Sequence, residues 1–150
     1  MSFVAEAERT IDAPPQRVFD RLADLASWPS WMPRSFAPVI RAGTPSPLRE
    51  GDRFRVRISG APVASKLRIS RLDRPHELTW RGGVRGLLWA EHRFVFEAVG
   101  DKKTRVRSIE TWNGALSGLL RRLVEPAAVR IGSQQLEGLA KATAMVREIN

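Results

Sequence analysis

The chain has 150 residues, with 25 Lys and Arg against 16 Asp and Glu, and a formal net charge of +9 at pH 7. It contains no cysteine and two histidines, which excludes a disulfide framework, a thiolate metal site and a cysteine nucleophile. No apolar run approaches the roughly 20 residues of a membrane-spanning helix, and the first six residues lack the pattern of a signal peptide. We therefore expect one domain over residues 1–150, in the cytoplasm, with no metal and no cofactor.

The N-terminal part predicts a strand followed by two short helices. Apolar and polar residues alternate over residues 3–11, which is typical of a strand. Asp12 can cap a helix whose first turn contains proline, and apolar residues then follow at helical spacing up to Leu25. A second short helical turn is expected over residues 27–31, and Pro33 ends it.

Strand patterns dominate the middle of the chain, and a helix pattern ends it. After a short strand within residues 36–41, apolar alternation recurs in the ranges 53–58, 65–70, 77–81, 88–97 and 104–113. The last 35 residues carry two apolar stripes at helical spacing, the first formed by Leu116, Leu120, Leu123 and Ala127. Pro126 lies between the stripes and is expected to bend the helix so that both meet the sheet. This order predicts an α+β fold with an antiparallel sheet.

The pairing of the last two strands follows from the cost of burying charge. The inward residues of the earlier strand are even-numbered, and burying Ser108 and Glu110 in the later strand costs less than burying the two arginines at its odd positions. A three-residue turn over Gly100–Lys102 then places His92 opposite Glu110. A five-residue turn would shift this pairing by one step.

His92 and Glu110 are therefore expected side by side on the concave face of the sheet, among aromatic residues. A neighbouring carboxylate raises the pKa of a histidine, while apolar burial lowers it. Three interpretations stay open: a polar anchor for a ligand hydroxyl or carbonyl, an acid–base pair, and a mutually satisfied buried pair that sets the register.

Several segments also match the motifs of a known superfamily. They are Ile-Asp-Ala-Pro-Pro-Gln-Arg-Val-Phe-Asp at 11–20, Trp-Pro-Ser-Trp-Met-Pro at 28–33, Leu-Thr-Trp at 78–80, His-Arg-Phe-Val-Phe-Glu at 92–97 and Trp-Asn-Gly at 112–114. The pattern resembles the START-like, helix-grip (SRPBCC) superfamily, and within it the polyketide cyclase/dehydrase and lipid-transport group. The resemblance implies a curved seven-stranded antiparallel sheet wrapped around a long C-terminal helix, with two short helices after the first strand.

The resemblance also implies an apolar cavity between sheet and helix that binds, and in one version carries, a hydrophobic small molecule such as a lipid or polyketide. The residues expected to contact it are Trp31, Phe54, Ile58, Leu67, Ile69, Trp80, His92, Phe94, Glu110, Trp112, Leu116, Leu120 and Met145. One alternative is a polyketide aromatase/cyclase-type enzyme with His92 and Glu110 as polar assistants. Another is that the inward side chains fill the space completely.

The basic excess is mostly arginine, which accounts for 21 of the 25 cations. Part of it falls on the outer sheet face, at Arg53, Arg55, Arg57, Lys66 and Arg68. No aromatic residues interleave with these cations, so we do not expect nucleic acid as a partner. Brief contact with an anionic membrane stays open, because Arg121 and Arg122 sit beside leucines. Monomer and homodimer are both compatible with the sequence.

Overall fold

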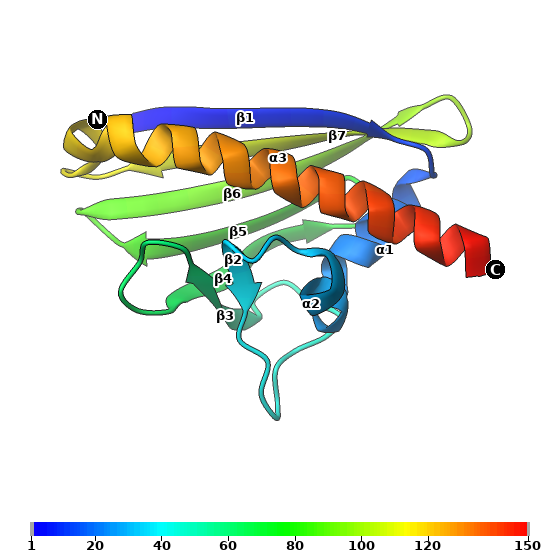
Figure 1. Cartoon of the computed structure of the whole chain (residues 1–150), viewed down its shortest axis with the longest axis horizontal. Coiled ribbons are helices and arrows are strands. Elements are labelled where there is room, and N and C mark those ends of the chain that lie inside the picture. Colours follow the sequence, from blue (N-terminus) through cyan, green and yellow to red (C-terminus); the bar gives the residue numbers. More distant parts are fainter. Residues whose placement is uncertain (1, 150) are drawn as a thin grey trace.

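The computed structural model describes residues 2–149, and the side chains of residues 2–144. Its strands are β1 (Ser2–Ile11), β2 (Phe36–Pro38), β3 (Arg53–Ile58), β4 (Ser65–Asp73), β5 (Glu77–Val84), β6 (Leu88–Val99) and β7 (Lys103–Asn113). Its helical elements are α1 (Pro15–Ala23), the 3-10 turn η1 (Leu25–Ser27), α2 (Trp28–Trp31) and α3 (Ser117–Ile149). The strands form one antiparallel sheet in the order β1-β7-β6-β5-β4-β3-β2, and α3 lies across its concave face (Figure 1). The predicted α+β helix-grip fold is confirmed.

Proline marks the change from β1 to α1. The helix begins at Pro15, and Pro14 rather than the predicted Asp12 occupies the cap position. Proline is favoured in the first turn because the first backbone N–H groups of a helix have no partner within the helix. The buried face of α1 packs Phe19 edge-on against Phe96 of β6, with 5.3 Å between ring centroids. This contact fixes α1 at one end of the sheet.

Trp28 forms the centre of an aromatic cluster beside α2. It is fully buried, and its indole N–H donates a hydrogen bond to the Leu22 carbonyl oxygen at 2.9 Å. Its ring centroid lies 5.5 Å from those of both Phe54 and Trp80, and 6.3 Å from that of Phe36. The space between sheet and helices is therefore filled by side chains at this end.

Small residues bring the first half of α3 close to the sheet, whereas in the second half the large residues Leu136 and Leu139 are buried in the core, as the second predicted stripe requires. A Cβ atom at Gly132 would lie 3.2 Å from the Ser108 hydroxyl oxygen, so α3 faces the sheet at this position. Leu123 lies nine residues earlier, which is two and a half turns at 3.6 residues per turn. It therefore points to the opposite side and is 74 % exposed. The prediction that the first stripe meets the sheet is wrong for Leu123, and Leu116, just before the helix, is also exposed.

The register of the last hairpin agrees with the prediction. His92 pairs with Glu110 and Phe94 with Ser108, and the turn over Gly100–Lys102 joins the paired residues on either side. The even-numbered residues of both strands face α3, as expected. Among residues 2–149, no helix combines the length and the apolar character needed to cross a membrane.

Candidate functional site

Two adjacent strands bring three polar side chains into contact on the inner face of the sheet. Nε2 of His92 lies 2.6 Å from the hydroxyl oxygen of Ser108, and Nδ1 of His92 lies 3.7 Å from Oε2 of Glu110. His92 and Ser108 are buried, whereas the Glu110 side chain is 14 % exposed. The His92 ring stacks on Phe94 at 4.3 Å and meets the edge of Trp80 at 5.0 Å. The pair predicted from the sequence is therefore present, with Ser108 as an additional partner.

Burial keeps this pair close to electrical neutrality. It lowers the pKa of His92 to about 3, because the charged imidazolium loses its hydration. It raises the pKa of Glu110 to about 7 for the same reason, and the nearby Trp112 indole N–H offsets part of this rise. The imidazole is therefore uncharged at neutral pH. The Glu110 carboxyl oxygen near Nδ1 of His92 favours the tautomer that carries its proton on Nδ1. In this tautomer Nε2 accepts a hydrogen bond from the Ser108 hydroxyl.

The order Ser108–His92–Glu110 follows the sequence of contacts in serine hydrolases, but the surroundings do not fit a nucleophile. The Gly132 Cα of α3 covers the Ser108 hydroxyl so closely that even a Cβ atom would crowd it. A substrate carbonyl would need to approach that same oxygen to about 3 Å. The hydrogen bond between Ser108 and His92 therefore acts as a fixed structural contact, and Glu110 has the most exposed side chain of the three.

Three further buried polar atoms lack a partner among the described residues. They are both amide atoms of Gln135 and the indole nitrogen of Trp112, although the Trp112 N–H lies close enough to the Glu110 carboxyl group to lower its pKa. Gln135 is 1 % exposed and lies three residues beyond Gly132, on the same side of α3. Buried polar groups are nearly always bonded in proteins, so the amide of Gln135 is a candidate contact for a further hydrogen-bonding group.

Gln135 was missed by the sequence prediction. The only available signal was its spacing from Gly132 and Leu139, which places it on the inward side of the helix. A glutamine in a long helix with polar neighbours is typical of a solvent-exposed position. Its burial became visible only when the rotation of α3 was known.

The other predicted residues are distributed over the inner face with unequal burial. Buried in the apolar core are Phe54, Leu67, Ile69, Trp80 and Phe94, with Trp31 and Ile58 packed partly buried against it. Trp112 and Leu120 are half-buried, Leu116 is exposed, and the side chain of Met145 lies outside the described residues. Their contact with a ligand remains a prediction.

Burial along β6 and β7 decreases toward the β5–β6 hairpin. The inward residues Phe94 and Val106 are inaccessible to solvent, whereas Ala90, Glu110 and Trp112 are half-buried. The polar group around Glu110 thus lies where the tightly packed core ends. Among the described residues, no three His, Asp or Glu side chains gather in a way that could hold a metal ion.

A family model described as polyketide cyclase/dehydrase and lipid transport matches residues 2–144. A search of curated proteins finds no significant match.

Solved structures share the fold at low identity. A hypothetical protein of Helicobacter pylori is 18 % identical with a TM-score of 0.74, and the match covers 94 % of this chain and 88 % of that one. A norcoclaurine synthase mutant of Thalictrum flavum, in complex with a transition-state analogue, is 10 % identical with a TM-score of 0.73, over 98 % and 97 % of the chains. The Zhui aromatase/cyclase of Streptomyces sp. R1128 is 14 % identical with a TM-score of 0.71, over 100 % and 97 %.

Proposed function

Because the chain belongs to the polyketide cyclase/dehydrase and lipid transport family, we propose that it binds a small hydrophobic molecule with a polar end between the sheet and α3. The observation that carries this proposal is the buried amide of Gln135, whose oxygen and nitrogen both lack a hydrogen-bond partner among the described residues. A buried donor or acceptor without a partner costs about 1–3 kcal/mol, and a ligand that supplies the missing partner recovers that cost. Apolar walls with a few convergent polar groups are typical of small-molecule sites.

The available groups define the ligand's polar end. Gln135 offers one acceptor and a donor pair, Trp112 offers a donor, and Glu110 exchanges a proton near neutral pH. A hydroxyl or keto group on a polycyclic or alicyclic body can bond to the Gln135 amide or to the Glu110–Trp112 pair, whereas a hydrocarbon cannot. We place the ligand's entry at the β5–β6 hairpin end, where the inward side chains are half-buried.

The test uses a panel of polycyclic phenols and hydroxyketones, each paired with the hydrocarbon of similar shape, for example 2-naphthol with 2-methylnaphthalene. Binding is measured by titration calorimetry and by quenching of tryptophan fluorescence. Gln135→Leu is expected to weaken binding of the polar member by about tenfold, the equivalent of one lost hydrogen bond, and to spare the hydrocarbon. Gln134→Leu, an exposed neighbour on the same helix, is the matched control. If no polar compound binds better than its hydrocarbon, the proposal is wrong.

A second candidate function is acid–base catalysis of polyketide cyclisation, which the pKa of about 7 at Glu110 favours. A carboxylate of that pKa can take the proton next to a ketone, while the electron pair moves to the ketone oxygen. The Trp112 indole N–H, which lies near Glu110, would stabilise the enolate oxygen. His92 would orient Glu110 through its Nδ1 side.

This candidate is tested with a poly-β-keto thioester, whose cyclised product is followed by chromatography. Glu110→Gln keeps the shape but cannot accept a proton, so turnover is expected to fall about a hundredfold while substrate affinity changes little. Unchanged turnover in Glu110→Gln would leave binding as the function.

A further inference from the structure

One end of the molecule presents aliphatic side chains to solvent. The β5–β6 hairpin and the start of α3 meet at this end, at the left of Figure 1. The hairpin exposes Val84 and Leu87, and the first turns of α3 expose Leu119 and Leu123, which are 79 % and 74 % accessible. Single exposed leucines are ordinary, but a group of them from two elements marks an interaction site.

Backbone contacts hold this apolar end together. The Ala115 N–H donates to the Gly86 carbonyl oxygen and the Leu116 N–H donates to the Leu87 carbonyl oxygen, both at 2.9 Å. Gly114 has a φ of 118°, and a Cβ atom there would collide with the Leu87 carbonyl. The hairpin tip and the start of α3 are thus joined as one surface before any partner arrives.

The opposite end of the sheet differs in character. Its turns join β4 to β5 and β6 to β7, and they carry Asp73, Arg74 and His76 in one and Asp101 and Lys102 in the other. The connection between β3 and β4 also lies at the apolar end, where it adds the exposed side chain of Val63. Most of the exposed aliphatic side chains therefore lie at the apolar end, although Val99 beside the β6–β7 turn is also exposed, at 37 %.

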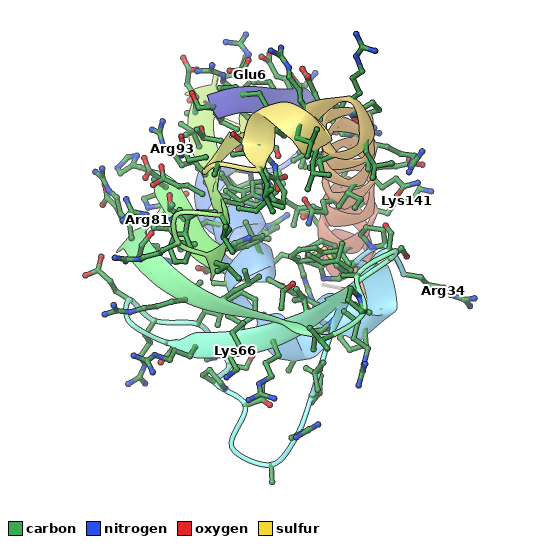
Figure 2. The ribbon with its side chains drawn as sticks, turned by 90° about the vertical axis from the view of Figure 1, so that its left-hand side faces the viewer. Glu6, Arg34, Lys66, Arg81, Arg93 and Lys141 are labelled. Atoms are coloured by element: carbon green, nitrogen blue, oxygen red, sulfur yellow. The ribbon has the colours of Figure 1, made fainter. Side chains whose placement is uncertain are left out.

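Cations adjoin the apolar end on the outer sheet face. A hollow of about 490 Å³ is lined by Arg53, Arg55, Lys66, Arg68 and Arg81, and it reaches Trp89 beside the hairpin tip. The Arg85 guanidinium lies over the Trp89 ring at 4.9 Å and connects the hollow to the tip. Figure 2 views this end and shows Arg81 on the outer side of the sheet, with Lys141 on the opposite side, beyond α3.

The positive charges of this hollow are poorly compensated by the protein. Strand pairing places Arg68 opposite both Arg53 and Arg81, and Arg55 opposite Lys66. Of these five cations, only Arg81 forms an ion pair with a described residue, Glu91, at 2.7 Å. Like charges directly opposite each other across strands destabilise a sheet, and an anionic surface would relieve the repulsion.

We propose that this end docks onto an anionic lipid membrane. A bilayer surface offers phosphates for the cations and an apolar layer for the leucines, and amphipathic surfaces of this kind bind at its interface. A nucleic acid would use the cations and leave the aliphatic side chains without a partner. A second copy of the chain would cover the leucines but would bring two cationic faces together. The inference stands independently of the interior ligand.

The first arm of the experiment tests the leucines by flotation with vesicles of phosphatidylcholine alone or with about 30 % phosphatidylglycerol. The wild type is expected to float with the anionic vesicles. Leu119→Ser combined with Leu123→Ser is expected to lower the partition constant at least about tenfold, and both positions are exposed enough to leave folding intact. Ile40→Ser, an exposed aliphatic residue in the β2–β3 loop, is the control and should bind like the wild type.

The second arm tests the charges. Arg53→Gln with Arg68→Gln is expected to weaken binding about threefold to tenfold and to reduce its dependence on salt, while Arg34→Gln, between α2 and β2, should not. Three results would overturn the proposal. The wild type could bind both vesicle types equally. The wild type could bind duplex DNA and not the anionic vesicles, and the double leucine variant could bind that DNA as tightly as the wild type. The wild type could bind no vesicles and form a dimer that the double leucine variant converts to a monomer.

Discussion

Gly132 of α3 lies directly over Ser108 of β7, at a distance where a Cβ atom on residue 132 would come within 3.2 Å of the serine hydroxyl oxygen. The same oxygen is bound to Nε2 of His92 at 2.6 Å. One glycine therefore links the position of the long helix to the polar group on the sheet. The serine hydroxyl has little freedom to move aside, because doing so would leave a buried imidazole unpartnered.

Replacing Gly132 by alanine tests this link. Glycine to alanine in a helix ordinarily stabilises a protein by about 1 kcal/mol, but crowding against Ser108 is expected to cancel most of that gain. In the Ser108→Ala background the nearest atoms would be Cβ atoms of Ala7 and residue 108, at 3.8 and 4.0 Å, and the gain should return. Urea unfolding of the wild type, the two single variants and the double variant measures the coupling free energy between the two positions. An equal effect in both backgrounds would show that the close approach carries no energy.

Glu110 and His92 are expected to shift stability with pH in opposite directions. Folding raises the pKa of Glu110 from 4.5 to about 7, so between these values the folded state holds a proton that the unfolded state has lost. The free energy of unfolding therefore falls as pH rises from 4.5 to 7. Folding lowers the pKa of His92 from 6.5 to about 3, so its contribution rises from pH 3 to 6.5. The two effects oppose each other between pH 4.5 and 6.5.

Glu110→Gln removes the first effect and leaves the second. Its free energy of unfolding, relative to the wild type, is expected to increase between pH 4.5 and 7 by up to about 3 kcal/mol, at about 1.4 kcal/mol for each pKa unit. Urea titrations at pH 4.5, 5.5 and 7 provide the measurement. Glu97→Gln, on the adjacent strand and exposed, controls for the loss of one charge. A difference that stays constant with pH would show that Glu110 ionises normally in the folded protein.

Gln135→Leu is expected to stabilise the ligand-free protein by about 1–3 kcal/mol. It replaces a buried amide that has no partner with an apolar side chain of similar size. Gln134→Leu, whose side chain is exposed, should change the free energy of unfolding by less than about 0.5 kcal/mol. Denaturant unfolding without added ligand distinguishes the two. A destabilised Gln135→Leu protein would indicate that the amide is already satisfied within the fold.

Arg68→Gln is expected to raise the melting temperature by about 1–2 °C. Arg68 lies between Arg53 and Arg81 on neighbouring strands, so its removal relieves two repulsions. The gain should shrink at high salt, where exposed charges are screened. Scanning calorimetry at low and high salt, with Arg34→Gln as the control, measures both. A lower melting temperature at low salt would mean that the arginine contributes more by packing than its charge costs.

The register of β6 and β7 could be predicted because burial of charge leaves few choices. If the odd-numbered residues of β7 faced inward, two arginines would be buried, so its even-numbered residues must face the core. A three-residue turn then places His92 opposite Glu110. The motif-based resemblance supplied the number of strands and the long helix. These features depend on alternation and spacing, which the sequence displays directly.

Which side chains of α3 face the sheet depends on the rotation of the helix about its axis, and the sequence did not predict that rotation for the first half of the helix. Large apolar side chains ordinarily mark the buried face of a helix, yet here Leu119 and Leu123 are exposed. The inward positions of that half include Ala128 and Gly132, whose small size allows close approach to the sheet. The same rotation buries Gln135. Its role could be inferred only from three-dimensional contacts.

The decline in burial along β6 and β7 separates the tightly packed part of the protein from the part where we propose that a ligand binds. Trp28 and Phe94 at the closed end are fully buried, so truncating either side chain is expected to destabilise the fold strongly. Ala90 and Trp112 at the loose end contribute less to the core and can vary at lower cost. A scaffold organised in this way can acquire new ligand preferences over generations without first losing its fold.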